Sequence, residues 1–180
     1  MSSGDLEDKK ILMIVAQRNF RDEEFFEPRE IFEDMDIDVT VASNSTDEAE
    51  GVLGRKIKPD ISIDDAIAAD YDAIVITGGG GSKEYLWSDK KLHELVQDAI
   101  EHEKVVAAIC ISPVVLAKAG VLTDKKATVF KDDGCIKELK SCKAIYKDEE
   151  VIISDNIVTG RDPKCAEKFG EAVLEALSRT

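Results

Sequence analysis

The sequence has little that would bind it to nucleic acid or to a membrane. Its 38 acidic residues outnumber 24 lysines and arginines, giving a formal net charge of −14. The basic residues form no block that could neutralise a run of phosphates. No apolar run approaches the ~20 residues that a helix needs to cross a bilayer, and the opening MSSGDLEDKK lacks the apolar stretch of a secretory signal. We therefore expect no nucleic-acid partner, no membrane association and a cytoplasmic protein.

Histidine and cysteine are also scarce, which limits the metal sites and catalytic pairs that the chain could build. The cysteines are spaced too irregularly for a zinc site, so we expect no structural metal and no cofactor (Cys110, Cys135, Cys142 and Cys165). Cys135 and Cys142 could oxidise to one another if their geometry permits. The two histidines, His93 and His102, fall on the expected wet face of one helix. A Cys-His pair of the protease kind is therefore not expected.

What the chain does contain is an alternation of apolar strands and amphipathic helices. At 180 residues it fits one domain, 1–180, with residues 1–8 expected to be flexible. The helix after the first strand should begin with Asp22 as its N-cap, and 51–60 suits a hairpin or an irregular excursion. The pattern predicts strands at 10–15, 37–42, 71–77, 105–109, 127–130, 144–146, 151–154 and 156–159, and further helices at 64–69, 89–103, 113–119 and 163–177. Strands and helices in this order predict a mostly parallel sheet between two helical layers, a three-layer α-β-α sandwich.

The segment AAICISP after the fourth long strand is the most informative part of the sequence. Cys110 stands between an apolar strand and a helix opened by Pro113, which is the arrangement of a nucleophile elbow. Ala108 and Ser112 are small enough to let the strand and the helix approach each other. We predict that Cys110 has a strained backbone, and that the following helix makes its thiol acidic and nucleophilic. The alternative is a buried cysteine that acts only as a small hydrophobic residue.

Two other loops should meet Cys110 at the carboxyl edge of the sheet, where α/β proteins place their sites. Glu24 follows the first strand, and its carboxyl could reach the sulfur, as could that of Glu23 or Asp22. A carboxyl beside a thiolate would hold its proton and could donate or shuttle it. Alternatively, the three acids only favour a helix N-terminus. The loop 78–81 consists only of glycine. Its backbone amides could form an oxyanion hole, or it could be an ordinary flexible loop. A phosphate site has weak support, because no Walker lysine accompanies the glycines.

Four segments together resemble the ThiJ/PfpI superfamily: ILMIVAQRNFRDEEF, AIVITGGGG, AAICISPVVLAKAGVL and IVTGRDP. This superfamily includes archaeal intracellular protease-like proteins and the parkinsonism-associated protein deglycase. The resemblance implies a flavodoxin-like, class I glutamine amidotransferase-like fold and a homodimer or a larger homo-oligomer. It also implies that Cys110 is the reactive cysteine and Glu24 its carboxyl partner, and that Gly79 and Ile111 supply the amides of an anion site, with Gly78 as a further candidate.

The resemblance also limits the activity. The protease-like branch carries a histidine directly after the cysteine, where this chain has Ile111, which argues against a peptidase. Glu84 resembles the acid that completes that branch's site across a subunit contact, but no histidine is present for it to orient. The deglycase branch often carries a histidine near the strand after the elbow, where this chain has Phe130.

Members of the superfamily without that histidine look like redox-sensitive stress proteins, or like glyoxalases and deglycases that act on α-oxoaldehydes. Chemistry of the second kind needs only a thiolate that adds to an aldehyde and a carboxyl that moves a proton. We therefore expect a cysteine-dependent glyoxalase or deglycase, a lyase or hydrolase of small reactive carbonyls. The alternative is a non-enzymatic redox sensor or chaperone-like protein.

Overall fold

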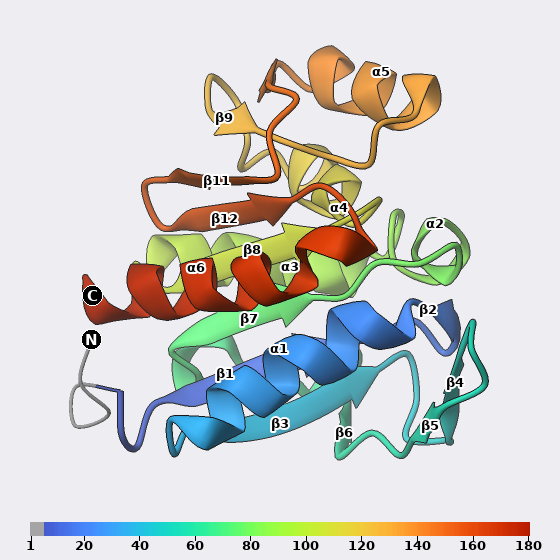
Figure 1. Cartoon of the computed structure of the whole chain (residues 1–180), viewed down its shortest axis with the longest axis vertical. Coiled ribbons are helices and arrows are strands. Elements are labelled where there is room, and N and C mark those ends of the chain that lie inside the picture. Colours follow the sequence, from blue (N-terminus) through green and yellow to red (C-terminus); the bar gives the residue numbers. More distant parts are fainter. Residues whose placement is uncertain (1–5) are drawn as a thin grey trace.

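A computed structural model describes residues 6–180 and arranges them around a seven-stranded sheet (Figure 1). The strand order is β11-β12-β8-β7-β1-β3-β6, and all neighbours are parallel except β11 and β12. The strands are β1 (Lys10–Ile14), β3 (Asp38–Ser43), β6 (Ile61–Ser62), β7 (Ala73–Ile76), β8 (Val105–Ile109), β11 (Val151–Ser154) and β12 (Ile157–Gly160).

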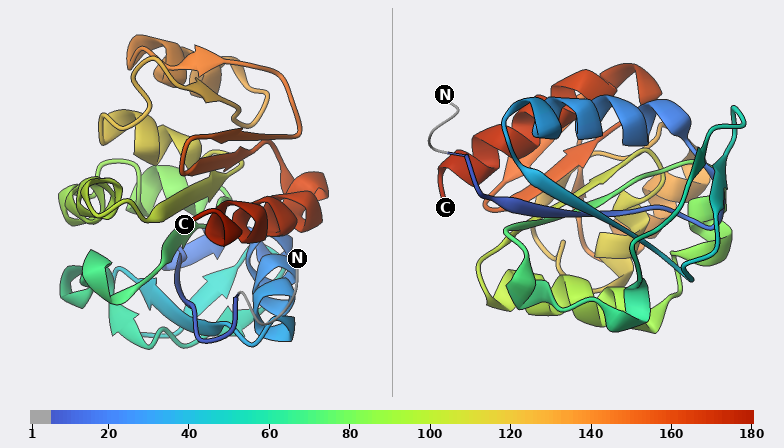
Figure 2. Two further views of the ribbon diagram at one scale, coloured as in Figure 1. Left: turned by 90° about the vertical axis from the view of Figure 1, so that its left-hand side faces the viewer. Right: turned by 90° about the horizontal axis from the view of Figure 1, so that it is seen from below.

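Helices cover both faces of this sheet, which is why its central strands are continuous apolar runs. Figure 2 shows α1 (Asp22–Asp34) and α6 (Ala166–Ser178) side by side on one face. On the other face lie α3 (Lys90–Glu101) and α4 (Pro113–Lys118). Alternate residues of β1 point to opposite faces, so Ile11 and Met13 join the core under α1 and α6, while Leu12 and Ile14 join the core under α3. The predicted three-layer α-β-α sandwich is confirmed.

Smaller elements surround this framework. A second, three-stranded sheet consists of β2 (Arg18–Phe20), β4 (Ala49–Gly51) and β5 (Lys56–Ile57), so the predicted hairpin at 51–60 is present as β4 and β5. A two-stranded sheet pairs β9 (Lys126–Ala127) with β10 (Ile145–Tyr146). The remaining helices are α2 (Gly81–Tyr85), α5 (Asp133–Ser141) and the 3-10 turns η2 (Ile63–Asp65), η3 (Ala68–Asp70) and η4 (Pro163–Cys165).

The structure differs from the sequence predictions at several places. Helix α5 was not expected, because it buries only Cys135 and Leu139 and so has a weak apolar pattern. The helix predicted at 64–69 is two separate 3-10 turns, and the last helix begins with such a turn at Pro163. Asp22 is not the N-cap of α1: Arg21 occupies that position without a side-chain hydrogen bond, and Asp22 is the first helical residue.

The amino-terminal segment is described only in part. Of residues 1–8, for which the sequence predicts flexibility, 1–5 lie outside the described residues. Leu6 is buried, and its carbonyl accepts a hydrogen bond of 3.1 Å from the amide of Lys9. Within 6–180, every helix is too short or too polar to cross a bilayer.

The strand order reverses between β1 and β7. From β1 the chain crosses to β3 on one side, and it later returns to β7 on the other side of β1. The carboxyl ends of β1, β7 and β8 lie at the right-hand edge of the sheet in Figure 1, where β2, α2 and the start of α4 meet. Open α/β sheets bind their ligands at such a point.

Candidate active site

Cys110 forms a sharp turn between β8 and α4. Its backbone φ is +65°, in the left-handed region that non-glycine residues adopt at a cost of ~1–3 kcal/mol. Two hydrogen bonds hold this conformation: the Cys110 amide donates to the Gly160 carbonyl at 2.9 Å, and the Phe130 amide donates to the Cys110 carbonyl at 2.7 Å. The strained nucleophile elbow that the sequence predicts is therefore present in the geometry, with Cys110 7 % exposed.

Ser112 ties this elbow to the glycine loop. Its hydroxyl donates to the carbonyl of Thr77 at 2.7 Å and lies 2.8 Å from the hydroxyl of Ser82. Ser112 and Ser82 are fully buried. The small residue that the elbow requires for steric reasons thus also joins it to the loop that follows β7.

Glu24 is the acid that faces Cys110. It is fully buried on α1, and neither carboxyl oxygen has a hydrogen-bond partner of ordinary geometry among the described residues. A methyl group built on Gly78 would lie 2.5 Å from Glu24 Oε1 and 2.6 Å from Cys110 Cβ, so both side chains press against the same glycine. The thiol is also near enough to shift the pKa of Glu24 through a hydrogen bond. A buried acid almost always has a partner, and here the nearby groups are the Cys110 thiol and the Gly78 amide.

Burial controls how this pair ionises. Loss of hydration raises the pKa of Glu24 from 4.5 to about 8, against smaller opposing effects of Cys110, the Gly78 amide and Arg21. Glu24 therefore holds its proton at neutral pH. Burial is the largest effect on the Cys110 thiol and, with the negative form of Glu24, raises its pKa above the ordinary value; hydrogen bonds from the amides of Gly79 and Ile111 oppose this rise. The sequence prediction of an acidic thiol considered only the stabilising amides, and burial of the sulfur opposes it.

The other two acids have separate partners. Asp22 is 2 % exposed, and its carboxylate accepts hydrogen bonds from the amides of Leu53 at 2.9 Å and Arg55 at 3.1 Å. Glu23 accepts a hydrogen bond of 2.8 Å from Nε of Arg21. Of the three acids that could have reached the sulfur, only Glu24 does so.

The glycines after β7 allow close packing at the site. Gly79 has φ +100°, and a side chain there would collide with the backbone of Asn19, Phe20 and Arg21. The carbonyl of Gly78 accepts a hydrogen bond of 3.0 Å from the Arg21 amide, which fixes the loop against the start of α1. This arrangement leaves the Gly79 amide directed at the sulfur of Cys110. The loop is therefore held by defined contacts and is not an ordinary flexible connection.

A cavity of about 450 Å³ opens above Cys110. Its lining combines the elbow and the glycine loop with residues from β2, the β4–β5 hairpin and two later loops: Asn19, Arg21, Val52, Gly79, Gly80, Cys110, Ile111, Phe130 and Pro163. Sequence reasoning missed Asn19, Arg21, Val52 and Pro163 as lining residues, because no local pattern shows which distant loops meet. Phe130, noted in the sequence only for the histidine it replaces, is bound directly to the elbow.

The histidines and Glu84 lie outside this cavity. His93 bonds to the Trp87 carbonyl at 2.8 Å, and His102 bonds to the Asp98 carbonyl at 2.7 Å. Glu84 is exposed on α2 and does not line the Cys110 cavity. Neither histidine is placed to act with Cys110, as the sequence indicates.

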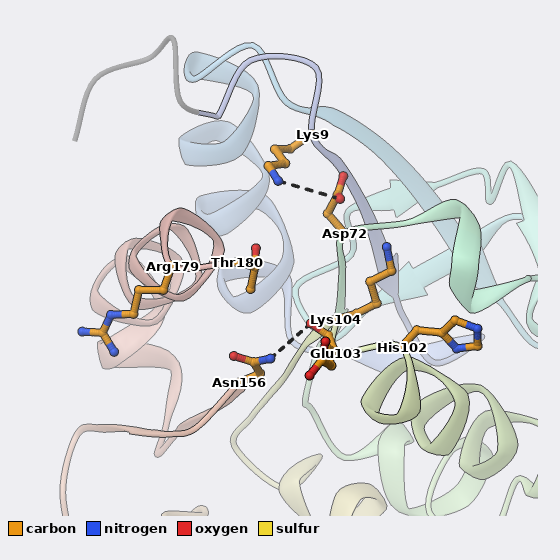
Figure 3. A pocket seen from close by; sticks show the side chains of 8 residues that line it. All are labelled: Lys9, Asp72, His102, Glu103, Lys104, Asn156, Arg179 and Thr180. Carbon is orange, nitrogen blue, oxygen red and sulfur yellow. Dashed lines mark hydrogen bonds and ion pairs between the residues drawn. The ribbon is translucent and has the colours of Figure 1, made fainter.

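A second hollow, of about 410 Å³, lies at the opposite edge of the sheet (Figure 3). Lys9, Asp72 and Lys104 each precede a strand there, and the chain terminus at Thr180 closes one side. The charges are mixed, and Lys9 pairs with Asp72 at 4.0 Å. This hollow contains no cysteine and lies at the amino ends of the strands.

The remaining cysteines do not form a second reactive centre. Cys135 and Cys142 lie two turns apart along α5, roughly 10 Å at ~1.5 Å per residue, whereas a disulfide needs Cα atoms ~4.4–6.8 Å apart. The bridge considered from the sequence is therefore not available in this fold. Cys165 donates to Asp162 at 3.3 Å, and burial, followed by this contact, raises the pKa of the Cys165 thiol. Across residues 6–180, no group of three His, Cys, Asp or Glu side chains could hold a metal ion.

Comparison with known proteins gives a consistent result. Residues 9–176 match the model of the DJ-1/PfpI family. An uncharacterised protein of Methanocaldococcus jannaschii is 47% identical over 175 residues, covering 97% of this chain and 85% of the relative. Protein/nucleic acid deglycase 2 of Escherichia coli is 31% identical over 172 residues, covering 94% of this chain and 98% of the relative. The crystal structure of a ThiJ/PfpI domain protein from Brachyspira murdochii has a TM-score of 0.91 at 30% identity, covering 97% of this chain and 99% of that one.

Proposed function

Because the chain belongs to the DJ-1/PfpI family, we propose that it is a thiol-dependent enzyme that converts small 2-oxoaldehydes, with Cys110 as nucleophile and Glu24 as proton carrier. The observation that carries this proposal is the buried carboxyl of Glu24, which faces the thiol and whose oxygens have no hydrogen-bond partner of ordinary geometry among the described residues. The similarity to a deglycase from Escherichia coli supports the same class of chemistry.

The pair is suited to present a thiolate while the carboxyl keeps the proton. Since burial raises the pKa of Glu24 to about 8, Glu24 carries no negative charge at neutral pH. Of the two main effects that oppose thiolate formation, the charge of Glu24 is then absent and the burial of the sulfur remains. The protonated carboxyl then donates a hydrogen bond to the sulfur, which also receives the amides of Gly79 and Ile111. Three donors around one sulfur favour its charged form.

The reaction needs no oxidant from outside. The thiolate attacks the aldehyde carbon, C1, and Glu24 gives its proton to the resulting oxyanion, which completes a hemithioacetal. The Glu24 carboxylate then removes the hydrogen of C1 as a proton and returns it to the neighbouring carbon, C2, while the C1 hydroxyl proton passes to the C2 oxygen. C1 is oxidised to a thioester and C2 is reduced to an alcohol within one molecule. Water hydrolyses the thioester, releasing a 2-hydroxy acid and the thiol.

The test is the conversion of methylglyoxal to lactate by four proteins: the wild type and the variants Cys110→Ser, Glu24→Gln and Cys142→Ser. Cys142 is the matched control, because it is a half-exposed cysteine outside the cavity. We expect lactate from the wild type and Cys142→Ser, and none above background from Cys110→Ser or Glu24→Gln. A wild type no faster than Cys110→Ser would refute the proposal.

A non-enzymatic redox sensor is the second candidate, and the same three donors favour it. They could hold the oxygens of a cysteine sulfinate, formed when two molecules of peroxide each transfer one oxygen to the sulfur and leave as water. Mild peroxide followed by intact mass and peptide mapping separates the candidates. A sensor gains two oxygens at Cys110 before any other thiol reacts and produces no lactate.

Two further expectations stay proposals. Peptidase activity has no support from the cavity, which contains no histidine, and silence with casein and short fluorogenic peptides would retire it. Self-association as a homodimer or larger homo-oligomer is tested by sedimentation of the purified protein, in which a monomer at micromolar concentration would contradict the expectation.

A further inference from the structure

The cavity above Cys110 contains one charged lining residue, and that residue is positive. Arg21 lines this space together with Asn19, with glycine backbone and with apolar side chains such as Val52 and Phe130. The chain as a whole has a formal net charge of −14, so one positive side chain in the lining of this cavity would favour anionic ligands over cationic ones. Ligand cavities of this kind orient their ligands through a few polar groups in an apolar lining.

The guanidinium of Arg21 is held in place with part of its binding capacity unused. Nε donates to Glu23 at 2.8 Å, and within the described residues neither terminal nitrogen makes a hydrogen bond. The hydrogen bond to Glu23 and the charge of Glu23 raise the pKa of Arg21, so the group is always charged. The planar fork of an arginine fits a carboxylate with two parallel hydrogen bonds. The contact with Glu23 therefore orients the fork and leaves its outer edge free.

The size of the cavity also exceeds what a three-carbon substrate requires. About 450 Å³ lie above Cys110, and a further hollow of about 360 Å³ shares Arg21, Phe130 and Pro163 with this cavity. The other residues that line the second hollow are charged: Glu23, Asp162 and Lys164. Cavities of ~300–1,000 Å³ accommodate drug-sized molecules. A longer substrate can thus place its aldehyde at the sulfur and its far end at Arg21.

We propose that Arg21 determines specificity by selecting 2-oxoaldehydes that carry a carboxylate at the end of a short carbon chain. This inference rests on the proposed function of Cys110 and Glu24. The carboxylate binds the two free nitrogens of Arg21, and the apolar chain packs between Val52 and Phe130. A single cation matches the single charge of a carboxylate better than the double charge of a phosphate. The reaction is the same internal redox conversion, so the product is a hydroxy dicarboxylic acid.

The experiment compares 4,5-dioxopentanoate, which would give 2-hydroxyglutarate, with neutral methylglyoxal. The measured quantity is the ratio of kcat/KM for the two compounds, in the wild type and in the variants Arg21→Met, Arg21→Lys and Lys164→Met. Lys164 is the matched control, a positive residue of the adjoining hollow that does not line the Cys110 cavity. We expect the wild type to favour the anionic compound at least about tenfold, since hydrogen bonds to charged groups are worth ~1.5–3 kcal/mol.

In Arg21→Met the ratio should fall by about 10–100-fold, mainly through KM, and Arg21→Lys should recover only part of it because a point charge lacks the fork. Lys164→Met should keep the wild-type ratio. A wild type that converts methylglyoxal without preferring the anionic compound overturns this inference alone, as does an unchanged ratio in Arg21→Met or an equal fall in Lys164→Met. A wild type that converts neither compound overturns the proposed function and this inference with it.

Discussion

Replacing Glu24 by glutamine should remove a pH dependence that the burial of this carboxyl imposes on folding. In the folded protein burial raises the pKa of Glu24 from 4.5 to about 8. Each pKa unit corresponds to ~1.36 kcal/mol, so a difference of about 3.5 between the folded and unfolded pKa values amounts to about 5 kcal/mol when the group has fully titrated. This is a large part of the ~5–15 kcal/mol by which a domain of this size is stable.

The sign follows from which state binds the proton. As the pH rises from 4.5 to about 8, the unfolded chain releases the proton of Glu24 while the folded protein retains it. The folded state binds more protons in this range, so the contribution of Glu24 to the free energy of unfolding falls as the pH rises. Glutamine has no proton to release. The variant should therefore gain stability relative to the wild type by up to about 5 kcal/mol between the two ends of this range.

Urea unfolding of both proteins at pH 5, 6, 7 and 8 measures this difference. The contributions of groups that titrate equally in the two proteins cancel in the difference between their free energies of unfolding, so this difference reports the titration of Glu24. Glu30→Gln is the control, because Glu30 is an exposed glutamate on the same helix, and its curve should run parallel to that of the wild type. A constant difference between Glu24→Gln and the wild type from pH 5 to 8 would refute the claim that Glu24 is buried in its protonated form.

Two further variants test how the site is held together. Gly79→Ala should lower the free energy of unfolding by several kcal/mol, on the order of the cost of a strained backbone added to a steric clash, because Gly79 has φ +100° and no room for a side chain. Gly80→Ala is the control, because a methyl group at Gly80 meets nothing within 4 Å. Equal stability of the two variants in urea unfolding would contradict the packing described. Asp22→Ala should lower the free energy of unfolding by ~1–3 kcal/mol per amide left unpaired, since its carboxylate accepts from Leu53 and Arg55, and unchanged stability would argue against its role in holding the hairpin.

The sequence was sufficient to predict those parts of the site that follow a strand directly. Cys110 and the glycine loop could be placed because each comes at the end of an apolar run, and the carboxyl ends of parallel strands meet at one edge. From its position alone Glu24 was one of three acids that could reach the sulfur, and the resemblance to the ThiJ/PfpI superfamily indicated Glu24. The structure gives the physical reason why Asp22 does not take this role, because the partners of Asp22 lie on a hairpin some thirty residues away.

What the sequence could not predict depends on contacts between distant segments. Arg21 and Val52 line the Cys110 cavity from loops that no periodicity connects. The burial of the thiol is likewise a property of the assembled fold, and it changes the expected ionisation of Cys110. Helix α5 has too few buried residues to give a clear helical pattern. Local pattern predicts elements, whereas the packing between elements determines the environment of the reacting groups.

The central claim is that Cys110 is a thiolate nucleophile stabilised by uncharged hydrogen-bond donors, one of them the protonated Glu24, and the rate at which iodoacetamide alkylates Cys110 as a function of pH tests this most directly. Peptide mapping resolves the four cysteines of the wild type. The account predicts that Cys110 reacts first at pH 7, with an apparent pKa below the ~8.5 of a free thiol, and that Glu24→Gln, which keeps a neutral donor, remains as reactive there. An apparent pKa at or above ~8.5, with Cys110 no faster than half-exposed Cys142, would contradict it.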